Sequence, residues 1–164
     1  MPTMTSLTSP HGFESTTAGD DVPPPPMNIV ILYDDQTAYR RAMHLLADML
    51  AGRANESAVR PLPRRFEELR FHPWRERAQN AAAEAEIFII ATSAKAPLPT
   101  HVTEWLSEAF AGRSVATAGV SVVYDADEDV HYFGALCETL VRHEADVAGL
   151  PFLEPGQLAI ACFR

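Results

Sequence analysis

The stretch "NIVILYDDQTAYRR" (residues 28–41) decides how the chain folds. An apolar run over residues 29–33 passes directly into two aspartates and then into a helix-forming segment. A short, continuous apolar run is typical of a strand that is covered on both faces of a sheet. Asp34 and Asp35 therefore follow the end of a buried strand, where they can bind a metal, accept a phosphoryl group or cap the helix.

Two further apolar runs of this kind, "EIFIIAT" (86–92) and "AGVSVVYD" (118–125), follow along the chain. Segments with helical spacing of apolar residues lie between and after these runs and predict helices over 35–52, 73–85, 99–113 and 129–149. Strands that alternate with helices favour a parallel sheet. We expect Ile31, Ile89 and Val122 to be buried in the three central strands.

The remaining strand signals are weaker. "SAVRPL" (57–62) contains Pro61, followed by Pro63, and prolines restrict a strand to the edge of a sheet. "LPFLE" (150–154) predicts a last short strand, and "LAIACFR" (158–164) predicts a segment that doubles back as an edge strand. The resulting fold class is α/β, a three-layer doubly wound parallel sheet with the flavodoxin-like strand order 2-1-3-4-5.

The chain divides into a tail and one domain. Residues 1–26 are rich in Ser, Thr and Pro and end in "VPPPP", so we expect them to be disordered. Residues 27–164 form the α/β domain. With 47% hydrophobic residues in a chain of 164, the domain has enough apolar side chains for a substantial core.

The formal net charge of −9 argues against a general nucleic-acid binder or a protein that binds anionic membranes. No apolar run is long enough to span a bilayer, so we expect a cytoplasmic protein. One segment departs from the acidic composition. "RPLPRRFEELRFHPWRER" (60–77) carries six arginines against three glutamates and predicts a solvated, locally cationic edge.

Ligands bind an open parallel sheet beyond the carboxyl ends of its strands. The loops expected there carry Asp34, Asp35 and Gln36, then Thr92, Ser93 and Lys95, and finally the acidic run 125–129. Cys137 and Cys162 lack the spacing of a metal site, and we expect both to be buried free thiols.

A central strand that ends in two acids and is followed at once by a helix resembles the receiver domains of two-component signalling. In that family the acid pair binds Mg²⁺, an aspartate at the end of the third strand accepts the phosphoryl group, and a lysine ending the fifth strand contacts it. Asp34 and Asp35 match the acid pair, which implies Mg²⁺ as the possible cofactor. Thr92 stands at the acceptor position, and "PFLE" has no lysine.

The chain is therefore similar to a degenerate receiver, or pseudo-receiver, of an uncharacterised bacterial family. The resemblance implies a non-catalytic regulatory domain in signalling that binds another protein or a second copy of itself. It also implies a metal site at Asp34 and Asp35, with no other catalytic or cofactor-binding residue.

Other readings of the same residues remain open. A Mg²⁺-dependent phosphoryl-transfer module similar to haloacid dehalogenases has Asp34, Thr92, Lys95, Asp125 and Asp127 in a compatible order, although Gln36 stands where the general acid belongs. A binder of a small ligand at the strand ends is a third class. Flavin and dinucleotide binding are disfavoured, because carboxylates follow the first strand and no glycine-rich phosphate loop occurs.

The structural reading is that Asp35 or Thr37 caps the helix. Two adjacent carboxylates without a cation repel each other, so this pattern predicts that Asp34→Asn is neutral or mildly stabilising in the absence of metal.

We expect that a chain beginning at Met27 has the same free energy of unfolding as the full chain, because residues 1–26 contain few core-forming side chains. Urea denaturation of both forms measures the difference. A loss of more than about 1 kcal/mol on removal of the tail would show that it packs on the domain.

Overall fold

The computed structural model describes residues 25–51, 59–113, 116, 119–125 and 131–161. Its centre is a four-stranded sheet in which every neighbouring pair is parallel, with the order β2-β1-β3-β4. The strands are β1 (Met27–Tyr33), β2 (Val59–Arg65), β3 (Ile87–Ala91) and β4 (Gly119–Val123).

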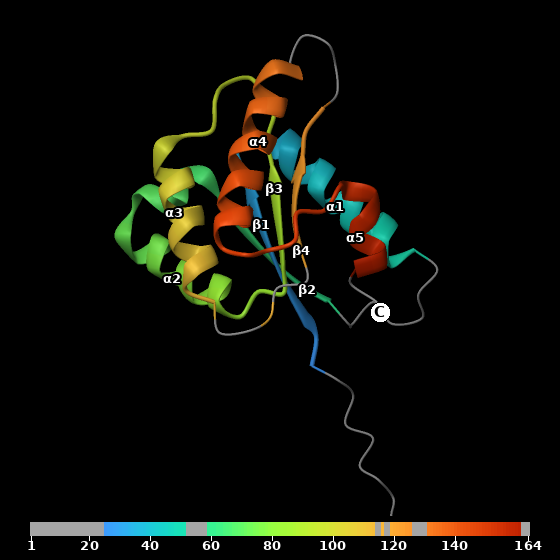
Figure 1. The fold of residues 1–164 in the computed structure, drawn as a ribbon. Helices are drawn as coiled ribbons and strands as arrows, with labels where there is room; N and C mark the ends of the chain where they lie inside the picture. The colour runs from blue at the N-terminus through green and yellow to red at the C-terminus, as the bar shows by residue number, and fades with distance from the viewer. Residues whose placement is uncertain (1–24, 52–58, 114–115, 117–118, 126–130, 162–164) are drawn as a thin grey trace, which may run out of the picture.

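Helices cover both faces of this sheet (Figure 1). They are α1 (Gln36–Leu50), the 3-10 helix η2 (Phe66–Arg70), α2 (His72–Ala83), α3 (Thr100–Ala111), α4 (His131–Val147) and α5 (Pro155–Ala161). The buried residues of α1 and α5 form one core with one face of the sheet, while those of η2, α2, α3 and α4 form a second core with the other face. The architecture is α/β with three layers, as in a doubly wound fold.

The central strands contribute to both cores because successive side chains of a strand point to opposite faces. In β1, Ile29 and Ile31 pack toward α1, and Val30 and Leu32 pack toward α2 and α3. The expected burial of Ile31, Ile89 and Val122 is confirmed, since none is more than 3% exposed.

Helix α3 buries the side chains that recur at helical spacing on its inner face, namely Val102, Trp105, Leu106, Ala109 and Phe110. The two tryptophans differ in their exposure. Trp105 is fully buried, whereas Trp74 is 45% exposed at the start of α2.

Strand β2 lies at the edge of the sheet, as its prolines predicted. Along a strand, the backbone N–H and C=O groups of successive residues point alternately to the strand on one side and to the opposite side. The Arg65 N–H points away from β1, because it donates to Glu68 Oε2 (3.0 Å). Pro61 and Pro63, which share this parity, therefore turn toward the open side. Because proline has no N–H, this edge lacks two donors that an added strand would need.

The predicted five-strand order is wrong in its last member. Among the described residues after β4, the pairing with the sheet is limited to a single bridge, Val120 to Phe152, so the segment 150–154 is not a strand of the sheet. The main chain of this segment makes two hydrogen bonds with Val120. The Val120 N–H donates to Pro151 O (2.9 Å), and the Leu153 N–H donates to Val120 O (2.8 Å). Pro155 then begins a helix, which ends the pairing.

The edge strand predicted over 158–164 is also wrong. Residues 155–161 form α5, with Leu158 fully buried against the α1 side of the sheet, and residues 162–164 lie outside the described part. The turn that starts α5 is closed by Gln157, whose Oε1 accepts from the Glu154 N–H (3.1 Å). A short apolar run such as residues 158–163 fits a strand or a helical segment equally well, so periodicity did not distinguish them.

Two further expectations concern the N-terminal tail and membrane-spanning helices. Of the predicted tail, only Pro25 and Pro26 are described, and both are exposed. Within the described ranges, no helix is both long enough and apolar enough to cross a membrane.

Ile89→Ala in β3 is expected to lower the free energy of unfolding by about 2–5 kcal/mol, because it opens a cavity in the centre of the sheet. Ile160→Ala provides the matched control, since the same change is made at a side chain that is 60% exposed, and should cost less than about 0.5 kcal/mol. Chemical denaturation of both variants checks this. Equal stabilities would contradict the central position of β3.

Candidate functional site at the carboxyl ends of the strands

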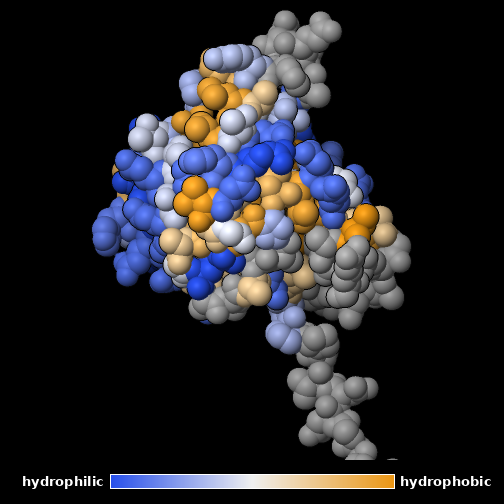
Figure 2. Space-filling model, viewed as in Figure 1, coloured by the Kyte–Doolittle hydropathy of each residue, from blue (hydrophilic) through white to orange (hydrophobic). Residues whose placement is uncertain are grey.

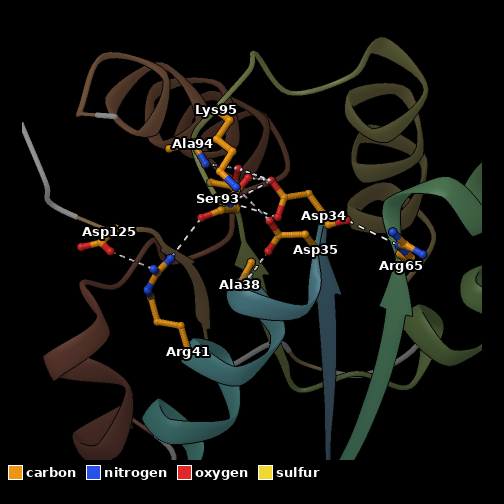
Figure 3. A network of polar contacts seen from close by, with 10 residues as sticks. Asp34, Asp35, Ala38, Arg41, Arg65, Ser93, Ala94, Lys95 and Asp125 are labelled. Atoms are coloured by element: carbon orange, nitrogen blue, oxygen red, sulfur yellow. Dashed lines mark hydrogen bonds and ion pairs between the residues drawn. The ribbon is translucent and has the colours of Figure 1, made fainter. Parts of the chain in front are cut away.

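The side chain of Asp34, directly after β1, is held by the loop that follows β3 (Figure 3). Its carboxylate accepts hydrogen bonds from the Thr92 hydroxyl (3.0 Å) and the Ser93 hydroxyl (2.7 Å). The Ser93 N–H also points at both carboxylate oxygens, at 2.9 and 2.8 Å. Charge-assisted bonds of this kind are stronger than neutral ones.

The main chain of Asp34 is tied to both neighbouring strands. Its N–H donates to Ala91 O at the end of β3 (3.3 Å). Its carbonyl oxygen accepts from Arg65 Nε at the end of β2, at a long 3.5 Å. Asp34 is therefore the point at which the ends of three strands meet.

Asp35 has a different role from its neighbour. Its backbone is extended (φ −140°, ψ 174°), and its Oδ1 accepts from the Ala38 N–H (2.9 Å), so it is the N-cap of α1. Its Oδ2 lies 3.8 Å from Lys95 Nζ, an exposed ion pair of small energetic value. The capping role considered from the sequence is confirmed for Asp35.

Arg41 extends the network to the loop after β4. From α1, its guanidinium donates to Thr92 O (3.4 Å) and to Asp125 Oδ2 (3.1 Å). The Asp125 side chain is 60% exposed, as expected for a solvated acidic turn, and residues 126–130 lie outside the described part. One arginine thus links the helix after β1 to the loops after β3 and β4.

The loop after β3 turns sharply at Ala94, which has φ +57°. An L-residue with a side chain rarely takes this conformation, at a cost of about 1 kcal/mol or more. The Ala94 N–H donates to Thr92 Oγ1 (3.0 Å), while the same hydroxyl donates to Asp34. The strained turn therefore places the Thr92 hydroxyl and the Ser93 amide where Asp34 can accept from both.

A small pocket of about 130 Å³ adjoins this loop. Its charged and hydroxyl-bearing residues are Asp34, Thr92, Ser93, Glu67 and Lys95, while Phe66 and the segment 96–99 supply the rest of the lining. Two carboxylates and one ammonium group face a space that fits only a few heavy atoms.

The predicted metal pair stays a prediction. The structure places Asp34 and Asp35 side by side in sequence but gives their carboxylates separate partners. Within the described residues, no group of three or more His, Cys, Asp and Glu side chains is placed to hold a metal ion. A cation at Asp34 would have to compete with the donors that bond its carboxylate, which are the Thr92 hydroxyl, the Ser93 hydroxyl and the Ser93 N–H.

The residues considered for a dehalogenase-like site are only partly brought together. Thr92 contacts Asp34, but Lys95 pairs with Asp35, and Asp125 pairs with Arg41. Asp127 lies outside the described residues.

Cys137, on α4, is a buried free thiol as expected, and Cys162 lies outside the described part. Burial, with smaller contributions from the charges of Asp34 and Glu138, raises the pKa of the Cys137 thiol to about 12. The thiol stays protonated near neutral pH and is a poor nucleophile.

Sequence reasoning found Asp34, Thr92 and Ser93 through the strand-end rule but missed Arg41 and Arg65. Arg41 lies on the second turn of α1, and Arg65 ends the edge strand. A basic residue about two turns after a strand-end acid was the available signal for Arg41.

Comparison of the chain with protein-family models, with curated proteins and with solved structures gives no match.

The hydrogen bonds reverse the expectation for Asp34→Asn. The amide would turn an NH₂ group toward donors, so we expect a loss of about 1–3 kcal/mol in the free energy of unfolding without metal. Asp125→Asn, which affects only an exposed ion pair, should cost less than about 1 kcal/mol. Urea denaturation compares the two, and a neutral or stabilising Asp34→Asn would contradict the hydrogen-bonded arrangement.

Proposed function

We propose that the chain is a non-catalytic, receiver-like domain that acts in regulation by binding a protein partner. The observation that carries the proposal is the capture of the Asp34 carboxylate by Thr92 and Ser93. In the family that the sequence resembles, this carboxylate contacts a metal ion. Here it supplies the acceptor for an internal hydrogen-bond network.

Phosphoryl acceptance by a receiver needs a carboxylate nucleophile, Mg²⁺ and a lysine that contacts the transferred group. At the acceptor position, Thr92 offers a hydroxyl that donates to Asp34 and accepts from the Ala94 N–H. Lys95, which is 75% exposed, pairs with Asp35 rather than pointing at Thr92. A hydroxyl of ordinary acidity in these bonds is a poor nucleophile near pH 7.

The network also explains how such a domain keeps its loops in place without phosphorylation or metal binding. Asp34, Arg41 and Arg65 join the ends of the strands and the start of α1 into one cross-linked layer of polar contacts. A layer held by internal bonds needs no phosphoryl group or metal to fix the loops. The domain then presents a constant surface to its partner.

A Mg²⁺-dependent phosphoryl-transfer module is the second candidate, because one contact favours it. Ser93 Oγ lies 2.7 Å from Asp34 Oδ2, in the pocket that also contains Lys95. A carboxylate at this distance is able to accept a proton from a serine hydroxyl.

Incubation with acetyl phosphate and Mg²⁺, followed by intact mass measurement, separates the two candidates. We expect an unmodified protein, and a thermal unfolding temperature that Mg²⁺ changes no more than NaCl of equal ionic strength does. A phosphorylated species that disappears in Thr92→Ala, Ser93→Ala or Asp34→Asn would overturn the non-catalytic proposal and favour phosphoryl transfer.

A further inference from the structure

Two large aromatic side chains are exposed one turn apart where η2 passes into α2. Phe71 is 60% exposed and Trp74 is 45% exposed, whereas Trp105 on α3 is fully buried. The α2 side of the molecule is otherwise largely hydrophilic in the view of Figure 2. Exposed aromatic residues among charged ones are typical of the centres of protein interfaces.

The aromatic pair is held on a rigid support. The Phe71 N–H donates to Glu68 O (3.2 Å), and the Trp74 N–H donates to Phe71 O (3.0 Å). Phe66 and Leu69 anchor η2 in the core beneath them. A partner therefore meets side chains whose backbone needs little ordering on binding, which lowers the entropic cost of association.

An arginine is stacked on one of the two aromatic side chains. The Arg77 guanidinium lies 5.0 Å from the centroid of the Trp74 ring. A guanidinium stacked on a ring keeps its N–H groups available in its own plane, where they match the two oxygens of a carboxylate. We name Phe71, Trp74 and Arg77, with Arg65 and Arg70 from the preceding residues, the aromatic–arginine surface.

The charge of this segment is opposite to that of the rest of the chain. Residues 60–77 have a net formal charge of +3, and the other residues together have −12. Glu67 is already paired with Arg70 (3.4 Å), and Glu68 accepts from the Arg65 N–H (3.0 Å). Arg65 and Arg77 form no ion pair with a carboxylate of the described residues.

We propose that the aromatic–arginine surface binds an acidic segment of a partner protein, with a large apolar side chain packed on Phe71 and Trp74 and flanking carboxylates on Arg65 and Arg77. This inference rests on the proposed function and names the surface and the chemistry of its partner. Charge complementarity selects an acidic segment, and the exposed rings select an apolar residue within it. A second copy of the chain is disfavoured because each copy carries a net charge of −9.

The surface adjoins the strand-end site. Arg65 donates to the Asp34 carbonyl oxygen, and Phe66 and Glu67, from the same segment, line the pocket next to Ser93. The network around Asp34 therefore helps to fix the end of β2 from which the surface begins.

The test uses the full chain and a fluorescein-labelled peptide in which glutamates flank a central Leu–Phe pair. Fluorescence anisotropy measures the dissociation constant, and a peptide with lysines in place of the glutamates is the charge control. We expect the acidic peptide to bind, the lysine peptide not to bind, and added NaCl to weaken binding. Trp74→Ala and Arg77→Glu should each raise the dissociation constant about tenfold or more.

Control variants truncate an exposed apolar side chain and reverse an exposed arginine charge elsewhere on the molecule. Val147→Ala alters an apolar side chain that is 72% exposed on α4, and Arg40→Glu reverses an exposed charge on α1. Both should leave the dissociation constant within about twofold. Because all four positions are exposed, circular dichroism is expected to show that each variant is folded.

Several outcomes would overturn the proposal. They are equal binding of the two peptides, unchanged binding in both Trp74→Ala and Arg77→Glu, and self-association in sedimentation velocity that Trp74→Ala removes. Binding of a single-stranded oligonucleotide in place of the acidic peptide would also overturn it. Failure here leaves the phosphorylation result intact, because that experiment depends on Asp34 and Thr92 and not on this surface.

Discussion

The carboxylate of Asp34 is the contact on which the carboxyl end of the sheet depends. A charged side chain at the end of a strand that is buried on both faces must find partners as it leaves the core. Thr92 and Ser93 provide them within 3.0 Å, from the loop after the adjacent strand. This set of bonds fixes the loop after β3, and with it the small pocket and the strained turn at Ala94.

The same contact connects the fold to the proposed role. A receiver that is switched by phosphorylation needs its acids to face a metal and an incoming phosphoryl group. In this chain one acid is bonded to the neighbouring loop, and the other caps α1. The two carboxylates that would bind a metal ion in a reactive receiver therefore hold the loop after β3 and the start of α1 in place. A fixed carboxyl end and a rigid η2–α2 connection suit a domain that works by presenting a surface.

The sequence predicted the parts of the fold that are decided by local pattern. Continuous apolar runs identified β1, β3 and β4, and Pro61 and Pro63 placed β2 at an edge. The last segment was misassigned, because a short, continuously apolar run has no clear period. Its burial depends on the contact of Leu158 with the α1 side of the sheet. The strand-end rule brought Asp34, Thr92 and Ser93 together, but the pattern could not show which atoms pair. Arg41 joined the site across 51 residues of sequence, and Trp74 could not be distinguished from the buried Trp105, because exposure depends on which elements pack over each ring.

Hydrogen exchange of the Ser93 amide, followed by NMR with and without Mg²⁺, tests the central claim most directly. We expect the Asp34 carboxylate to protect this N–H from exchange, and we expect the same protection with and without Mg²⁺. Fast exchange of the Ser93 amide without Mg²⁺, or a loss of its protection when Mg²⁺ is added, would show that Asp34 is available to a cation and would contradict the account.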